Sequence, residues 1–438
     1  MDRILLVGSG DFAAEVATAL EPLEVELVSL DEPGEEEVED ALEAPAPSRV
    51  LVVSRDDAFA LRWALFVRHH DPDVPLLVTI FDPTTAQQVD RLIEGCRVTS
   101  MADIVAPSLA GPCLGDDLIA VRADADGDGT SGDPIGLRET EDGVEEAPVE
   151  VPPRRRVRAL TTAVLRPYDK SAALLLIGAL GLAGVLLLET IGGVVVLGQG
   201  FIDAVYGAAK TLVSVDPNDK VADGPKGFKA FLTVSMLLTL FFEAAFTAGL
   251  VNRLIDRKLT GIVGKRTVPR RDHVVVVGLG QVGLRLCLLL RECGIGVTGV
   301  TDEAEESESV GLARDFGLPV VTGRGGDPSL LRRLSLEHAV ALAAVTDDDL
   351  ENVSVAMAAL SVNPDLRIVL RAGDGHIANE TRSLVRLGVV RDVHRIAAAL
   401  IAAQATGSSA RQVICKGDDA HLLHEDGRVE KAATAAAA

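Results

Sequence analysis

The stretch His273-Val-Val-Val-Val277-Gly278-Leu-Gly280-Gln281-Val282-Gly283 decides how this chain folds. Its run of valines predicts a buried strand, because β-branched side chains favour extended backbone and a short apolar run suits a sheet interior. The three glycines that follow permit a tight turn, and residues 284–292 read as a helix. Such a turn brings the free N–H groups of a helix N-terminus close to a bound anion. The stretch therefore predicts a strand, a turn and a helix with a phosphate site at the turn.

The same pattern occurs a second time at the start of the chain. The apolar run Ile4–Val7 leads into Gly8-Ser-Gly10-Asp11-Phe-Ala13, in which alanine replaces the third glycine. In each copy a second apolar run ends in an acidic residue, Asp31 at 23 residues after Gly8 and Asp302 at 24 residues after Gly278. A carboxylate about 20 residues beyond such a turn binds ribose hydroxyls. Both copies are therefore candidate nucleotide sites.

Strands and helices continue to alternate after each turn, and several strands end in polar residues. Examples are Ser54-Arg-Asp56-Asp57 in the first half and Thr346-Asp347-Asp348-Asp349 in the second half. Ligands of a doubly wound sheet bind at the carboxyl ends of its strands. We therefore predict an α/β protein with two Rossmann-like doubly wound domains, over residues 1–122 and 272–405.

Composition limits the remaining segments. The net charge of −23 argues against nucleic acid as a partner, because phosphates require a basic surface. Residues 123–153 are rich in Asp, Glu, Gly and Pro and predict a disordered acidic linker. Residues 406–438 predict a C-terminal tail that ends in alanines. The five cysteines and eight histidines show no metal-ligand spacing, and no catalytic constellation is present, so we expect neither a metal site nor an enzyme.

Two long apolar stretches, 171–197 and 230–252, separate the two domains. A membrane-spanning helix needs about 20 apolar residues. We therefore predict a two-span transmembrane domain over residues 154–260. Basic residues cluster on both outer flanks, which places both termini in the cytoplasm of a plasma (inner) membrane protein. We expect Glu189 to be solvated near the outer interface. The flanking basic residues are Arg154, Arg155, Arg156, Arg158, Arg166 and Lys170 before the pair, and Arg253, Arg257, Lys258, Lys265 and Arg266 after it.

The segment between the two spans predicts a short amphipathic helix over 201–213, followed by the turn cluster 216–219. The helix is too short to cross a bilayer. A re-entrant segment is one interpretation, since irregular backbone at membrane depth must be buried in protein or line water. An extracellular cap loop is the other.

The hairpin resembles the pore domain of two-span, tetrameric potassium channels, whose filter reads Thr-Val-Gly-Tyr-Gly-Asp. Aligning Tyr206 and Thr211 with that pattern puts 214–219 at the filter, where both glycines are missing and Pro217 restricts the backbone. One hypothesis is a homotetramer whose rings of carboxylates pass monovalent or divalent cations. The other is a non-conducting membrane anchor. Glu243 either faces the ion path or pairs with Lys210. The candidate pore residues are Ser214, Val215, Asp216, Asp219 and Glu243.

The combination of a hairpin with these α/β domains resembles the TrkA-N or RCK family, the nucleotide-binding regulators of potassium channels and transporters. The resemblance implies that NAD(H) or an adenine nucleotide (ATP or ADP) binds to the second domain, with Asp327 near the ligand and with Thr346 and Asp347 close to its phosphates or ribose. The implied residues are Gly278, Gly280, Gln281, Val282, Gly283, Asp302, Asp327, Thr346, Asp347 and Arg371, and in the first domain Gly8, Gly10, Asp11 and Asp31.

These features together predict a nucleotide-regulated cation channel or transport protein of the potassium-channel type. Nucleotide binding in the cytosol would bias the pore between its closed and open states. The alternatives are a non-conducting, NAD-sensing membrane subunit and, with less support, a membrane-bound NAD-dependent oxidoreductase. The lipid bilayer, cations and three further copies of the chain are the expected partners.

Overall fold

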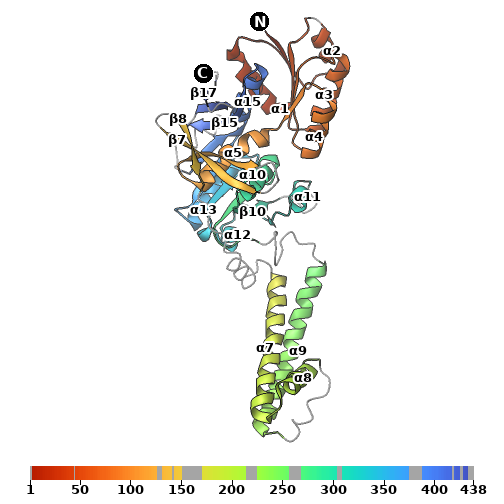
Figure 1. Ribbon diagram of the computed structural model, residues 1–438, viewed down its shortest axis with the longest axis vertical. Coiled ribbons are helices and arrows are strands. Elements are labelled where there is room, and N and C mark those ends of the chain that lie inside the picture. Colours follow the sequence, from red (N-terminus) through yellow and green to blue (C-terminus); the bar gives the residue numbers. More distant parts are fainter. Residues whose placement is uncertain are drawn as a thin grey trace. The chain divides into compact units, whose positions relative to one another are not determined.

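The protein is described by a computed structural model of residues 1–438 (Figure 1). The chain divides into two compact units, residues 1–154 with 269–438 (unit 1) and residues 155–268 (unit 2). The structure describes all residues except 1, 44, 126–130, 141–142, 150–169, 214–223, 256–267, 303–307, 374–386, 417–418, 425–427 and 433–438.

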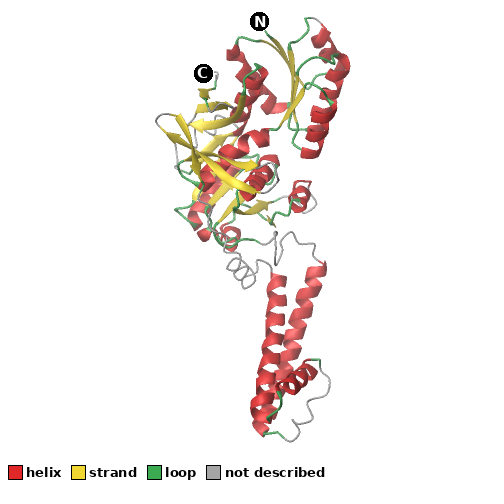
Figure 2. Cartoon of the chain, viewed as in Figure 1, coloured by secondary structure: helices red, strands yellow, loops and turns green. Residues whose placement is uncertain are grey.

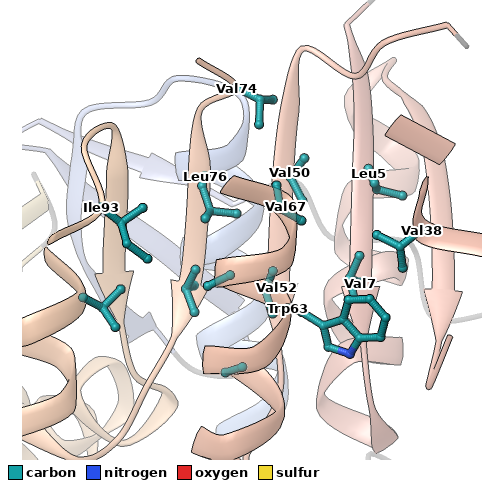
Figure 3. Packing of buried hydrophobic residues seen from close by; sticks show 14 of the residues in the cluster. Leu5, Val7, Val38, Val50, Val52, Trp63, Val67, Val74, Leu76 and Ile93 are labelled. Atoms are coloured by element: carbon teal, nitrogen blue, oxygen red, sulfur yellow. The ribbon is translucent and has the colours of Figure 1, made fainter. Parts of the chain in front are cut away.

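The first α/β module of unit 1 contains a five-stranded parallel sheet in the order β2-β1-β3-β4-β5. Trp63 is 1% exposed and packs among valines and leucines of the sheet, as Figure 3 shows. The strands are β1 (Arg3–Gly8), β2 (Glu26–Asp31), β3 (Arg49–Val53), β4 (Leu76–Thr79) and β5 (Cys96–Thr99). The helices between them are α1 (Gly10–Leu20), α2 (Glu35–Glu43), α3 (Asp57–His70) and α4 (Pro83–Leu92).

The second α/β module contains a six-stranded sheet in the order β11-β10-β9-β12-β13-β14, also parallel. The predicted class, α/β with doubly wound Rossmann-like sheets, is confirmed. The strands are β9 (His273–Val277), β10 (Gly296–Thr301), β11 (Val320–Thr322), β12 (Ala341–Ala344), β13 (Arg367–Ala372) and β14 (Val389–Asp392). The helices are α10 (Gln281–Glu292), α11 (Glu308–Asp315), α12 (Pro328–Arg333) and α13 (Asp349–Val362).

Each module continues into a helix and a three-stranded antiparallel sheet. In the first module these are α5 (Met101–Leu114), β6 (Leu118–Ala125), β7 (Ser131–Thr140) and β8 (Gly143–Pro148). In the second they are α15 (Val393–Ala405), β15 (Ala410–Lys416), β16 (Asp419–His424) and β17 (Val429–Lys431). The predictions of a disordered linker over 123–153 and of a tail over 406–438 are therefore wrong for these strands.

The physical reason is that a few apolar residues from both small sheets share one core. Ile119, Leu137 and Ile414 are at most 9% exposed and pack together, with Val144 and Leu423 against them. Neighbouring positions such as Glu145 and Glu146 are exposed, and their charge dominates the local composition. Either segment alone buries too little to fold, but the two segments together complete one cluster.

The two modules pack against each other through corresponding helices. Helix α1 of the first module packs on α15 of the second, and α10 of the second packs on α5 of the first. Arg285 of α10 forms an ion pair with Asp103 of α5, and Arg367 of β13 forms one with Asp116 at 2.6 Å. The modules therefore form an internal pair with approximate two-fold symmetry.

Unit 2 consists of helices in its described part, as Figure 2 shows. The two long helices, α7 (Lys170–Leu197) and α9 (Lys226–Ile255), are long and apolar enough to cross a membrane, and the short helix α8 (Phe201–Leu212) lies between them in sequence. In the most apolar stretch of each helix, only 22% of α7 and 17% of α9 is buried, so neither is the core helix of this unit. They cross closely at Gly249, where an added Cβ would lie 2.6 Å from the Leu175 amide nitrogen.

The expectation that Glu189 is solvated is wrong. This α7 side chain is 4% exposed, and its Oε1 accepts a hydrogen bond of 2.5 Å from Ser235 Oγ of α9. Thr211 of α8 provides a second side-chain hydrogen bond to the same carboxyl group. Glu189 therefore links all three helices, which satisfies a polar group that would otherwise be costly to bury.

Candidate functional site

The glycine turn of the second module accepts glycine alone at two of its positions. Gly278 has φ +95°, and an added Cβ would lie 2.6 Å from the Thr346 amide nitrogen. An added Cβ at Gly283 would lie 1.8 Å from the Gly278 carbonyl oxygen. These contacts bring β9, the start of α10 and the end of β12 into direct backbone contact. The turn is therefore set by packing as well as by its conformation.

The start of α10 is open in the same turn. Gly280 is the N-cap residue, makes no side-chain cap hydrogen bond, and has no atom within 4 Å of an added Cβ. The predicted site residue Val282 is 1% exposed, so its side chain belongs to the core and only its backbone faces the turn. An open helix N-terminus with no side-chain cap suits an anion, because N–H groups and the helix dipole point toward it.

The two predicted acidic site residues, Asp302 and Asp327, have different surroundings. Asp302 directly follows β10 and is exposed, at the strand end beside the glycine turn. Asp327 instead caps α12: its carboxylate accepts hydrogen bonds of 2.8 Å from the amide and from the hydroxyl of Ser329. These bonds lower the pKa of Asp327. Asp302 therefore lies exposed at a strand end, whereas Asp327 stabilises its own helix.

Thr346 is held by a residue that the sequence analysis did not assign to the site. Asn352 of α13 is 1% exposed, and its Oδ1 accepts from the Thr346 amide at 2.9 Å and from the Thr346 hydroxyl at 3.0 Å. Its Nδ2 donates to the carbonyls of Thr346 at 3.0 Å and Arg371 at 3.2 Å. Asn352 therefore joins the ends of β12 and β13 beneath the turn. A polar residue inside an apolar helix is the signal that could have found it.

Asp347 lies between two arginines. Arg371 of β13 is 4% exposed and bonds to Asp347 Oδ1, and Arg55 Nη2 of the first module donates to Asp347 Oδ1 at 3.0 Å and to Oδ2 at 3.1 Å. Burial by itself would raise the pKa of Asp347, but the charges of Arg371 and Arg55 outweigh it and lower that pKa. The carboxylate therefore stays charged. From the sequence alone, Arg55 is recognisable only as part of a polar strand end.

The first module contributes a second contact at this junction. The side-chain amide of Gln281, the first residue of α10, donates to the Arg55 carbonyl at 3.0 Å. The ring of Phe12 from α1 packs against the imidazole of His394 from α15, with the ring centroids 6.0 Å apart. The Nδ1 atom of His394 lies 3.1 Å from the Gly373 carbonyl oxygen. Burial, and then the charge of Arg371, lower the pKa of His394. The glycine turns of both modules therefore lie at the junction between them.

The turn of the first module differs from that of the second in charge and in packing. An added Cβ at Gly8 would lie 2.3 Å from the Ala13 Cβ, and Gly10 has φ +72°. Asp11 is exposed in the first turn of α1, at the position that Gln281 occupies in α10. Asp31 ends β2 and is exposed, and acidic residues at the start of α2 follow it closely, namely Glu35, Glu36 and Glu37. A phosphate would meet carboxylates here.

The predicted pore residues lie mostly outside the described residues, namely Ser214, Val215, Asp216 and Asp219. Glu243 of α9 is exposed in the single chain. Among the described residues it forms no ion pair with Lys210, whose ammonium lies 5.9 Å from the centroid of the Tyr206 ring. Which of the two alternatives for Glu243 holds therefore stays a prediction.

The chain is similar in sequence to a known domain family and to several known proteins. Residues 274–391 match the TrkA-N domain family. "Potassium channel protein 1" of Methanocaldococcus jannaschii is 26% identical over 203 residues, which cover 44% of this chain and 60% of that protein. The "Voltage-gated potassium channel Kch" of Escherichia coli is 27% identical over 118 residues, 26% of this chain and 28% of that protein. The chain therefore spans less than two thirds of these relatives.

Two solved structures share the fold over most of this chain. The GsuK RCK domain has a TM-score of 0.50 at 12% identity, covering 92% of this chain and 76% of that chain. The GsuK channel has a TM-score of 0.51 at 13% identity, covering 92% and 64%. A GsuK channel bound to NAD is similar at a TM-score of 0.32 and 17% identity, over 61% of this chain and 48% of that chain. The second module matches the TrkA-N domain family, the chain is similar in sequence to potassium-channel proteins, and its fold is similar to that of the GsuK RCK domain.

Proposed function

We propose that this chain is a nucleotide-regulated membrane protein of the potassium-channel type, in which a nucleotide bound to the second module biases a cation pathway. The observation that carries the proposal is the open N-terminus of α10, with Gly280 uncapped by any side chain and Asp302 exposed at the end of the neighbouring strand. Phosphates suit the helix start, and a carboxylate suits ribose hydroxyls. NAD(H) and the adenine nucleotides contain both phosphates and ribose hydroxyls.

We assign one nucleotide to each chain, in the second module. Asp11 supplies a negative charge at the start of α1, where a phosphate would otherwise bind, whereas the corresponding Gln281 is neutral. A carboxylate in the first turn already satisfies the helix dipole and repels a second anion. The first module is then a structural partner whose turn packs on the second module through Phe12.

Titration of the detergent-solubilised full-length chain with NADH and with ADP tests this assignment. We expect one site per chain. The exchange Gln281→Asp, which copies the first module, is expected to weaken binding by roughly tenfold or more, because it adds a negative charge beside the phosphate. The matched exchange Asp11→Gln is the control and should leave affinity unchanged. Two sites per chain, or equal affinity in Gln281→Asp, would contradict the assignment.

The membrane part of the proposal rests on the two apolar helices, with both termini in the cytoplasm as the basic flanks indicate. In a homotetramer, Asp216 and Asp219 would form rings that attract cations. The nucleotide would act through linkage, by binding the open and closed states with different affinity. Reconstituted bilayers should show a cation current that depends on nucleotide and falls in Asp216→Asn.

A second candidate function is a non-conducting regulatory subunit with the same nucleotide site. The sequence at the filter position favours it, because both glycines of the potassium filter are missing and Pro217 removes a backbone N–H. The two candidates differ in one measurement. A purified protein that binds nucleotide but passes no current, with or without nucleotide, is the regulatory subunit.

A further inference from the structure

An arginine of the first module reaches the glycine turn of the second. Arg55 lies in the loop between β3 and α3, and its carbonyl accepts the hydrogen bond of 3.0 Å from Gln281 Nε2 at the start of α10. Its guanidinium binds Asp347 at 3.0 and 3.1 Å. Arg55 is therefore held beside the helix N-terminus to which the nucleotide phosphates are assigned.

Two arginine side chains at the junction each have a hydrogen-bond donor that is not used. Within the described part of the chain, Nε of Arg55 and Nε of Arg371 are buried atoms with no hydrogen-bond partner. The Arg371 residue as a whole is 4% exposed. An arginine Nε always carries a proton and never accepts, and nearly all buried donors in native proteins have a partner. The junction is therefore suited to one further group that is rich in acceptors.

The existing partner of Arg55 is easily exchanged. The side chains of Arg55 and Asp347 are 37% and 61% exposed. Ion pairs with this exposure contribute little to stability, because water screens them. A phosphate, in contrast, offers several oxygens to the planar fork of an arginine and binds it in a bidentate way. A phosphate group can therefore engage Arg55 without a large loss elsewhere.

We propose that Arg55 is a ligand-binding residue of the second module's site, where it and Arg371 donate to a phosphate group of the bound nucleotide. This inference rests on the proposed nucleotide site and adds a residue from the other module. The consequence is that the ligand contacts both modules and stabilises their pairing. Nucleotide binding would then affect the contact between the two modules as well as the second module itself.

The test uses the detergent-solubilised full-length chain and calorimetric titration with ADP, adenosine and inorganic phosphate. We expect Arg55→Ala to weaken ADP binding by roughly tenfold or more, the effect of losing a charge-assisted hydrogen bond. Adenosine, which lacks phosphate, should bind to Arg55→Ala and to the wild type equally. Arg55→Lys should recover part of the loss, because it restores the charge but not the fork. Arg62→Ala is the matched control, since Arg62 of α3 is exposed and pairs with Glu35 at 2.9 Å.

The outcomes separate this inference from the proposed function. Equal ADP affinity in the wild type, Arg55→Ala and Arg62→Ala overturns the role of Arg55 while leaving the nucleotide site intact. A wild type that binds neither ADP nor adenosine overturns the nucleotide site itself. A third outcome is that Arg55→Ala abolishes the binding of inorganic phosphate but leaves ADP affinity unchanged. In that case Arg55 binds a free anion, and the proposal that it binds the nucleotide phosphate is overturned. Unfolding temperatures of the variants near the wild-type value show that the protein remains folded.

Discussion

The two modules of unit 1 share a topology and differ in the residues at their turns. Both modules have a parallel sheet that begins with β1 or β9, a glycine turn, and a helix that starts directly after it. Gln281 stands in the second module where Asp11 stands in the first, and His273 where Arg3 stands. The first two glycines of the turn are retained in both modules, while the third glycine and the residues at positions 11 and 3 differ from their counterparts Gln281 and His273. A duplicated fold can keep its architecture and assign different tasks to its two copies.

The junction shows the same divergence. Arg55 and Asp347 occupy corresponding positions, because each directly precedes the N-cap residue of the next helix, Asp56 or Asp348. In a pair of identical modules these positions would carry the same charge and repel each other. The fused chain has opposite charges there, and they form an ion pair. Fusion therefore permits a complementarity that a homodimer lacks.

The sharpest way to break the comparison is to place the first module's residue in the turn of the second. In Gly283→Ala the new Cβ meets the Gly278 carbonyl oxygen at 1.8 Å, although Ala13 is accommodated at the corresponding position of the first module. We expect the second module to lose about 3 kcal/mol or more, because the contact is with backbone and cannot be relieved by a rotamer change. Hydrogen exchange of β9 peptides measures the loss.

The control for this variant is Ala13→Gly in the first module. It should cost about 1 kcal/mol, the difference in helix propensity between alanine and glycine. Equal and small effects in both modules would show that the two turns pack alike, contrary to the structure.

A second test compares the first residues of β1 and β9. His273 is fully buried, and burial lowers its pKa to about 4, although its Nε2 lies 3.1 Å from the Leu334 carbonyl oxygen. The unfolded chain binds this proton near pH 6.5, so stability falls as the pH drops from about 6.5 toward 4. The loss is about 3 kcal/mol for a single group.

The measurement is the unfolding free energy of the second module between pH 7 and pH 4, by hydrogen exchange or by denaturant titration. His273→Leu is expected to flatten the profile over this range, and Arg3→Leu in the first module is the matched control that should not. A profile that is unchanged by His273→Leu would show that other groups cause the acid sensitivity.

The smallest expected effect concerns how each module ties its strand ends together. In the second module Asn352 makes this connection, and in the first module Thr79 Oγ1 accepts from the Ser54 amide at 2.9 Å and donates to the Ser54 carbonyl at 2.8 Å. Asn352→Leu should destabilise the second module by about 2 kcal/mol, because it leaves buried backbone groups of Thr346 and Arg371 unpaired. Thr79→Val should cost the first module about 1 kcal/mol. Equal effects would indicate that water replaces the lost partners.

Much of unit 1 could be predicted from residue patterns. The valine run, the glycine turn and the acid at the next strand end identify a doubly wound sheet, because each feature is local and has one structural use. The strands β7 and β8 could not be predicted this way. Their apolar residues are few, and Ile414, which packs on Leu137, lies far away in sequence. The composition of this segment is dominated by the charged residues on the exposed face of the small sheet. Only the folded structure shows that its other face is buried in a core shared with the second small sheet.

The site divides in the same way. Gly278, Gly280, Gly283 and Asp302 were identified from spacing, and the structure gathers them at one end of the sheet. Arg55 and Asn352 were not, because they act on residues that other elements bring to them. Asp327 was implied by resemblance, and in this chain its carboxylate is used as a helix cap.

The amino-acid sequence by itself determined the two α/β modules, the pair of apolar helices and the position of the glycine turn, since these depend on neighbours within a few residues. The tertiary structure alone decided that Glu189 is buried against Ser235, that Asp347 meets an arginine from the other module, and that two acidic segments complete a common core. Each of these depends on elements distant in sequence. Burial and electrostatic pairing are properties of the surrounding space, and that space exists only once the chain has folded.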